Sequence, residues 1–145
     1  DTCVDYGCAK GFLVHALRIL GSKAYGEDMS EYAINNCHPA VKDYLSLPNK
    51  KLYDLLICKD MLEQVEEVDI PAVLHLFKQK SDEYEVDITH VTKKDEEWWI
   101  KTFEKNGFEL VKFSYEFGSI KKKWVDKFPY GNGFFILNHD DSHDG

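Results

Sequence analysis

The stretch of this sequence with the clearest chemical potential is a turn rich in small residues, DYGCAKG at positions 5–11. It follows a short apolar run and precedes a segment whose apolar residues recur at helical spacing. In a parallel sheet, ligands bind at such turns, beyond the carboxyl ends of the strands. Small side chains let the backbone approach a ligand closely, and free N–H groups at a helix start can receive a carboxylate. Because Asp5 can accept from a cationic amino group, we expect this turn to bind an amino-acid moiety.

The order of the small residues separates this turn from a dinucleotide site. A dinucleotide fingerprint requires G-x-G-x-x-G. Here Gly7, Ala9 and Gly11 give G-x-A-x-G, and Phe12 would block the close helix packing that the third glycine allows. Taken alone, the stretch is explained about as well by a tight turn with no ligand.

A second acid, Asp28, strengthens the ligand hypothesis. It follows a predicted strand at residues 23–26, where a carboxylate can accept from both hydroxyls of a ribose. The alternative is a charge placed at the start of the next helix, which Ser30 is expected to cap.

These residues need elements to position them, and the chain supplies alternating ones. Apolar and alternating runs predict strands at 2–5, 23–26, 41–44, 53–58, 84–88, 108–117 and 133–137. Helical spacing predicts helices at 12–20, at 31–37, after Pro71 and at 96–106, with Trp98 and Trp99 as packing residues. The pattern predicts an α/β fold: a doubly wound, mostly parallel, Rossmann-like sheet with an antiparallel strand pair at its C-terminal edge. Residues 1–138 would form one domain and residues 139–145 a polar tail.

Charge and composition narrow the function classes. A net charge of −8 repels phosphate backbones and disfavours nucleic acid as a partner. No apolar run approaches the length of a membrane span, and the polar tail HDDSHDG lacks a framework for a metal, so we expect no metal. The four cysteines form no Cys-x-x-Cys pair, which indicates reduced thiols and a cytoplasmic protein.

Three segments, in order and with family-like spacing, resemble the class I S-adenosylmethionine (SAM)-dependent methyltransferase family. They are VDYGCAKGFLVHAL, AYGEDMSEYAI and YDLLICKDMLEQV, and the later THVTKKDEEWWIKTFEKNGFEL resembles the carboxyl half of its small-molecule members. The resemblance implies SAM as cofactor and methyl transfer to a small molecule, with the acceptor left open. It implies one set of cofactor residues: Asp5, Gly7, Ala9 and Gly11 for the methionine end, Asp28 for the ribose, Met29, Asp43 and Tyr44 for the adenine, and Lys59 and Asp60 for the floor beyond the fourth strand.

The sequence departs from the family pattern at several points. Ala9 replaces the middle glycine, which the backbone tolerates if the φ of Ala9 is negative. Gln64 stands where many members have a histidine. The helix before the first strand and the glycine turn before the fifth are not found, so the domain reads as trimmed or as lacking segments.

Catalysis therefore has two interpretations. A hydroxyl acceptor would gain from a general base, for which the candidates are His90 and Glu63. His90 is equally a candidate for a simple hydrogen bond to a loop carbonyl. The alternative function is a non-catalytic SAM-fold module that binds a ligand or acts as a scaffold.

Overall fold

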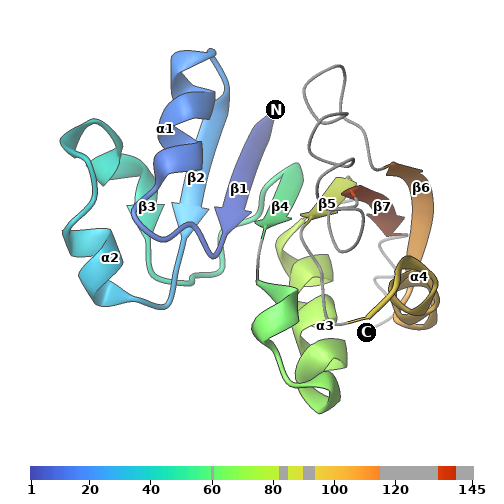
Figure 1. Ribbon diagram of the computed structural model, residues 1–145. Helices are drawn as coiled ribbons and strands as arrows, with labels where there is room; N and C mark the ends of the chain where they lie inside the picture. The colour runs from blue at the N-terminus through green and yellow to red at the C-terminus, as the bar shows by residue number, and fades with distance from the viewer. Residues whose placement is uncertain (60, 82–84, 90–93, 115–133, 140–145) are drawn as a thin grey trace, which may run out of the picture.

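A computed structural model describes the chain except for residues 60, 82–84, 90–93, 115–133 and 140–145 (Figure 1). The strands are β1 Thr2–Tyr6, β2 Lys23–Glu27, β3 Leu45–Ser46, β4 Leu55–Lys59, β5 Glu85–Thr89, β6 Phe108–Ser114 and β7 Phe134–His139. The α-helices are α1 Phe12–Ile19, α2 Glu31–Asn35, α3 Ile70–Lys80 and α4 Glu96–Lys105. Short 3₁₀ helices are η1 Pro39–Tyr44, η2 Leu62–Gln64 and η3 Glu67–Asp69.

The seven strands form one sheet in the order β3-β2-β1-β4-β5-β7-β6. Strands β1 to β5 pair in parallel, and β7 runs antiparallel between β5 and β6. The predicted fold class, including the antiparallel pair at the C-terminal edge, is confirmed. Because β1 lies between β2 and β4, the carboxyl ends of these three strands meet at one place.

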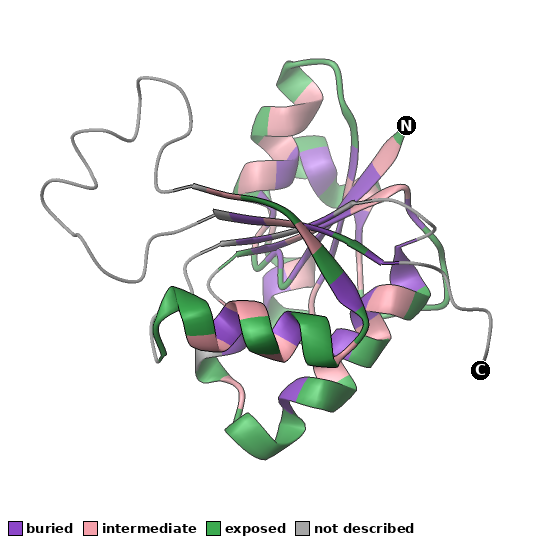
Figure 2. Ribbon diagram, turned by 90° about the vertical axis from the view of Figure 1, so that its right-hand side faces the viewer, coloured by how far each residue is buried: buried purple, intermediate pink, exposed green. Residues whose placement is uncertain are grey.

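Side chains of the central strands alternate between two cores, one on each face of the sheet. Cys3 of β1 packs with Val14 of α1, whereas Val4 packs with Leu74 and Phe77 of α3. Figure 2 shows helices on both sides of the sheet, as a doubly wound fold requires. Burial of both faces explains why the central strands read as nearly continuous apolar runs.

Helix ends follow the local signals in the sequence. Gly21, with a φ of 90°, follows the end of α1, and Gly107, with a φ of 89°, follows the end of α4. The Ser30 hydroxyl caps α2 by accepting from the Ala33 N–H at 3.2 Å. Trp99 of α4 is buried and its ring lies 5.7 Å from that of Phe103, so the packing role predicted for it is confirmed.

The strand predicted at residues 41–44 is wrong. These residues lie in η1, which Pro39 begins and which the His38 ring caps by accepting from the Ala40 N–H at 3.0 Å. A proline at the first position and a side-chain cap favour a helical turn over an extended one. The third strand follows instead as β3, with only two residues paired to β2.

The last strand also extends further than predicted. Strand β7 includes His139, whose ring is buried and lies 2.8 Å from the Ser81 hydroxyl. The first residue of the expected tail thus belongs to the sheet, and residues 140–145 lie outside the described part of the chain.

None of the helices that the structure describes has the length and apolar character needed to cross a membrane. None of the four cysteines, all of which the structure describes, forms a disulfide, and Cys3, Cys8 and Cys58 are buried.

Candidate functional site

The turn between β1 and α1 is tied to the end of β2 by its backbone. The N–H groups of Gly7 and Cys8 both donate to the Glu27 carbonyl, at 2.8 and 3.1 Å. Gly7 has a φ of 87°, which favours glycine because a side chain would strain the backbone there. The turn therefore holds its curved shape without any ligand.

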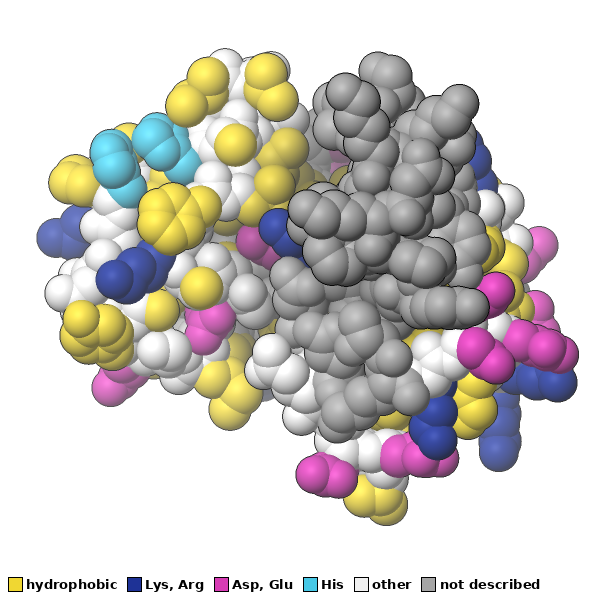
Figure 3. Space-filling model, in the orientation of Figure 1, with side chains coloured by type: hydrophobic (Ala, Val, Ile, Leu, Met, Phe, Trp, Pro, Cys, Tyr) yellow, Lys and Arg dark blue, Asp and Glu magenta, His cyan; other side chains and the backbone are white. Residues whose placement is uncertain are grey.

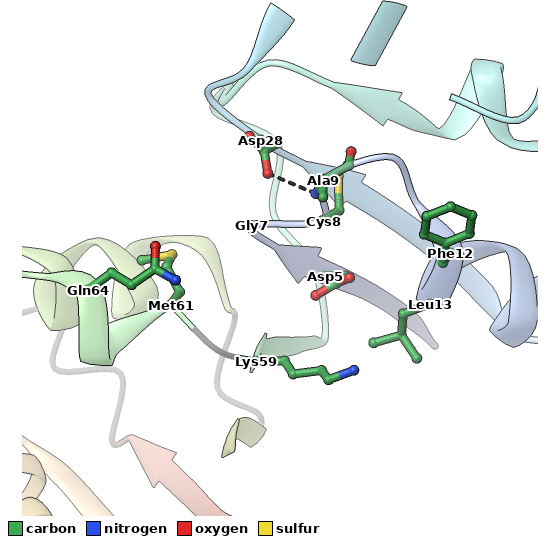
Figure 4. Close-up of a pocket in the computed structure, with 10 residues that line it drawn as sticks. All are labelled: Asp5, Gly7, Cys8, Ala9, Phe12, Leu13, Asp28, Lys59, Met61 and Gln64. Atoms are coloured by element: carbon green, nitrogen blue, oxygen red, sulfur yellow. Dashed lines mark hydrogen bonds between the residues drawn. The ribbon is translucent and has the colours of Figure 1, made fainter. Parts of the chain in front are cut away.

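Asp28 connects this turn to the start of α2. One carboxylate oxygen accepts from the Ala9 N–H at 2.8 Å, and the other accepts from the Ser30 N–H at 2.8 Å (Figure 4). Each oxygen has capacity for a further donor. Asp28 thus fixes the turn between β1 and α1 relative to the start of α2.

The condition for tolerating alanine at this position, a negative φ, is not met, because Ala9 has a φ of 50°. This left-handed conformation costs a non-glycine residue about 1–2 kcal/mol. The hydrogen bond from its N–H to Asp28 holds Ala9 in that conformation.

A cavity of about 390 Å³ opens beside the turn, at the carboxyl ends of β1 and β4. We call it the polar cavity, and ten described residues line it (Figure 4): Asp5, Gly7, Cys8, Ala9, Phe12, Leu13, Asp28, Lys59, Met61 and Gln64. Burial raises the pKa of Asp5 to about 6, against the opposing charge of Lys59 and with the help of Asp28. Burial likewise raises the pKa of the Cys8 thiol to about 12, so this cysteine is not a nucleophile at neutral pH.

A second cavity of about 380 Å³ adjoins the first. We call it the apolar cavity, and its described lining is Tyr6, Gly7, Asp28, Met29, Met61, Gln64, Val65, Val73 and Leu76. Four of these residues also line the polar cavity, including Asp28. The two cavities therefore meet at Asp28, and each has the size of a small-molecule site.

Apolar side chains stand at the rims of the two cavities. Phe12 of the polar cavity is 74% exposed and Met29 of the apolar cavity is 83% exposed. Figure 3 shows hydrophobic side chains on the surface over α1 and α2. Large apolar side chains left exposed beside a cavity are typical of a ligand-binding surface.

The structure brings together most of the residues that the sequence predicts for a cofactor site. Six of them line the two cavities: Asp5, Gly7, Ala9, Asp28, Met29 and Lys59. Two further candidates, Asp60 and His90, lie outside the described residues. Glu63 lies in η2, beside Gln64, but the structure does not describe its side chain.

Gly11 does not line either cavity. A Cβ at this position would lie 2.7 Å from Leu45 Cδ1 and 3.2 Å from Val41 Cγ2, so it would point into the core beneath α1. Gly11 also has a φ of 81°. The resemblance assigns Gly11 to the methionine end of the cofactor, but in the structure this residue faces the core, where packing and backbone conformation require glycine.

Asp43 and Tyr44 do not line the described cavities either. Both precede β3 and so lie toward the amino end of that strand, away from its carboxyl end. The Tyr44 ring packs against Arg18, whose guanidinium carbon lies 3.5 Å from the ring centroid. Their expected place beside the adenine came from the family resemblance, whereas the structure places both residues in η1.

The sequence analysis did not predict several of the residues that line the cavities. Met61, Val65, Val73 and Leu76 form the wall of the apolar cavity. Met61 lies two residues beyond the end of β4, in the loop region where such a sheet binds its ligands, and that position is the signal that could have found it. Val73 and Leu76 read only as the buried side of a helix, because they also pack against the core.

Within the part of the chain that the structure describes, no three side chains of histidine, cysteine, aspartate or glutamate gather as a metal site.

No protein-family model matches the sequence, and no curated protein matches it. Solved structures do. A magnesium protoporphyrin IX methyltransferase from Synechocystis PCC 6803, solved with bound SAM, is 18% identical, with 94% of this chain and 69% of that chain covered and a TM-score of 0.71. A SAM-dependent methyltransferase from Archaeoglobus fulgidus is 14% identical, with 96% and 86% covered and a TM-score of 0.69. A TehB-like SAM-dependent methyltransferase from Corynebacterium glutamicum is 13% identical, with 96% and 79% covered and a TM-score of 0.70.

These likenesses agree with the strand order and with the place of the cavities in the sheet. At such low sequence identity these structures show the fold alone. The fold that the sequence resemblance implied is confirmed. The chain has the fold of the class I SAM-dependent methyltransferases.

Proposed function

We propose that this chain is a SAM-dependent methyltransferase that acts on a small molecule and binds its cofactor across the polar and apolar cavities. One observation carries the proposal: Asp28 stands where the two cavities meet and is hydrogen-bonded to the turn that forms the wall of the first. Several of the similar structures contain SAM, its demethylated product SAH, or sinefungin, which supports the same ligand class here.

The two cavities match the two ends of this cofactor. The polar cavity has Asp5 for the ammonium group of the methionine part, and Gly7 and Ala9 allow the backbone to approach it. The apolar cavity offers Met29, Met61 and Val65 to an adenine ring. Asp28 would accept from the ribose hydroxyls between them, since both carboxylate oxygens have spare acceptor capacity.

Bound in this way, the cofactor supplies an already activated methyl group, so the protein needs mainly to align the acceptor. Alignment alone can supply several kcal/mol of the barrier, up to about 7–11 kcal/mol in well-oriented systems. Gln64 lines both cavities, and its neutral amide can orient an acceptor but cannot remove a proton at neutral pH. For an acceptor that must lose a proton, we keep Glu63 and His90 as the candidate bases.

Gln64 also favours the second candidate function, a non-catalytic module that binds SAM or a partner. If no base stands near the acceptor, a weak nucleophile would react slowly. The enzyme and a SAM-binding module would share the cofactor site and differ in turnover, whereas a scaffold that binds a partner would need no cofactor.

The test combines binding with turnover. Calorimetry would measure SAM and SAH binding, and mass spectrometry would follow transfer of an isotope-labelled methyl group from SAM to a pool of small metabolites. Labelled product above an Asp28→Ala control would support the enzyme. Cofactor binding without a labelled product would support a non-catalytic SAM-binding module. No binding of either compound would overturn the methyltransferase and favour a scaffold.

A further inference from the structure

We propose that Lys59 binds the carboxylate of the cofactor's amino-acid end, opposite Asp5, and so makes the polar cavity selective for ligands that carry a complete amino acid. This inference rests on the proposed SAM binding and adds to it the residue that binds the carboxylate.

The strand register places Lys59 beside Asp5. Strands β1 and β4 are parallel neighbours in which Asp5 is paired with Ile57, and side chains alternate along each strand. Asp5, Ile57 and Lys59 therefore share one face of the sheet. Ile57 packs in the core under α1, so this is the face that α1 covers.

Lys59 reaches the polar cavity from the end of β4. Its side chain extends past Asp5 toward Leu13 of α1 (Figure 4), and all three residues line the same cavity. Because β4 ends at Lys59, the ammonium group lies at the carboxyl edge of the sheet, level with the turn that follows β1.

The charges of the described lining residues match a zwitterion. Asp5 and Asp28 supply the negative groups and Lys59 the one cation among the ten lining residues. Lys10 lies in the turn itself, but its ammonium group lies 5.6 Å from the centroid of the Tyr32 ring, on α2. Lys59 is thus the cation placed to receive a carboxylate.

The described residues leave the Lys59 ammonium group available. None of the ion pairs found among them, at N–O distances up to 4.0 Å, includes Lys59. Asp5 and Lys59 line the same cavity, and the charge of Lys59 opposes the rise that burial causes in the pKa of Asp5. A cation and an anion that interact without direct pairing leave room for the carboxylate and ammonium groups of one amino acid between them.

The experiment compares two probes that differ in the amino-acid part. SAH has the complete amino acid, whereas 5′-methylthioadenosine has the same nucleoside and sulfur but neither the carboxylate nor the ammonium group. Calorimetry would measure the Kd of each for the wild-type chain, for Lys59→Met and for Lys42→Met. Lys42 is an exposed lysine of η1 and lines neither cavity, so it is the matched control.

In Lys59→Met we expect SAH to bind about tenfold or more weakly, the size of one hydrogen bond to a charged group. The affinity for 5′-methylthioadenosine should stay within about twofold of wild type, a change below about 0.4 kcal/mol, because this probe has no carboxylate for Lys59 to bind. Lys42→Met should leave both affinities unchanged. Lys59→Arg should restore part of the SAH affinity, because a guanidinium group also binds carboxylates.

Other results would overturn the inference in distinguishable ways. Unchanged SAH affinity in a folded Lys59→Met chain would remove Lys59 from the site. An equal loss for both probes would mean that Lys59 shapes the cavity and does not read the carboxylate. A wild-type chain that binds neither probe would refute the proposed function itself.

Discussion

A buried ion pair behind the candidate site gives the sharpest prediction about stability. Glu27, at the end of β2, and Lys80, at the end of α3, lie 2.9 Å apart with side chains 0% and 4% exposed. The Lys80 ammonium group also donates to the carbonyls of Asn49 and Lys51, at 2.7 and 3.0 Å. One lysine thus joins the end of β2 to the segment between β3 and β4.

Replacing Lys80 with methionine keeps an unbranched side chain that is one heavy atom shorter and removes its charge. It leaves a fully buried Glu27 carboxylate without its cation and two carbonyls without their donor. Removal of one partner from a buried ion pair costs about 3–5 kcal/mol, because the other charge stays buried and unpaired. We expect Lys80→Met to lose that amount, a large part of the 5–15 kcal/mol that stabilises a typical domain.

Urea unfolding followed by tryptophan fluorescence would measure the loss, since Trp99 is buried in the core. Lys101→Met is the control: its ion pair with Glu97 is 3.1 Å long, but both side chains are more than 70% exposed. We expect the unfolding midpoint of this control to stay at the wild-type value. A loss below about 1 kcal/mol for Lys80→Met would refute the reasoning, because it would show that Glu27 is solvated or neutral without its partner.

Three further predictions concern the candidate site. Asp28→Ala should weaken SAM binding by roughly 1–3 kcal/mol in a folded chain; calorimetry that finds wild-type affinity would remove Asp28 from the ribose site. Gly11→Val should lower the free energy of unfolding by about 2–4 kcal/mol, because valine would be strained at this φ and would overpack against Leu45. The SAM affinity of the folded fraction should be unchanged. A stable variant that no longer binds SAM would contradict our placement of Gly11. Asp5, with its pKa raised to about 6 by burial, binds more protons in the folded than in the unfolded chain between about pH 4 and 6, so ligand-free stability should fall as pH rises through that window. SAM affinity should rise as Asp5 ionises between pH 5 and 7, and a titration series that shows the same pH dependence in Asp5→Asn would contradict its role.

The parts of the fold that local signals determine could be predicted from the sequence. Gly21 and Ser30 mark helix ends by their own conformational or capping preferences, and the structure places both there. Asp5 and Asp28 could be placed at a common edge because parallel strands bring their carboxyl ends together. The acids and the turn of the candidate site were therefore predictable from spacing alone.

Features that depend on long-range packing could not be predicted in this way. The contact that a Cβ at Gly11 would make depends on Leu45, which lies 34 positions later in the chain. Tyr44 reads as part of a strand, but its ring packs on Arg18 of α1. Nothing in the local sequence around Lys80 indicates that Glu27 is buried beside it.

The most direct test of the central claim is a calorimetric titration of the 145-residue chain with SAM and with SAH, each in the presence of a metal chelator. We predict that both compounds bind, with one site per chain, and that Asp28→Ala weakens both. Binding of neither compound by a chain shown to be folded, or binding that the chelator abolishes, would contradict the account.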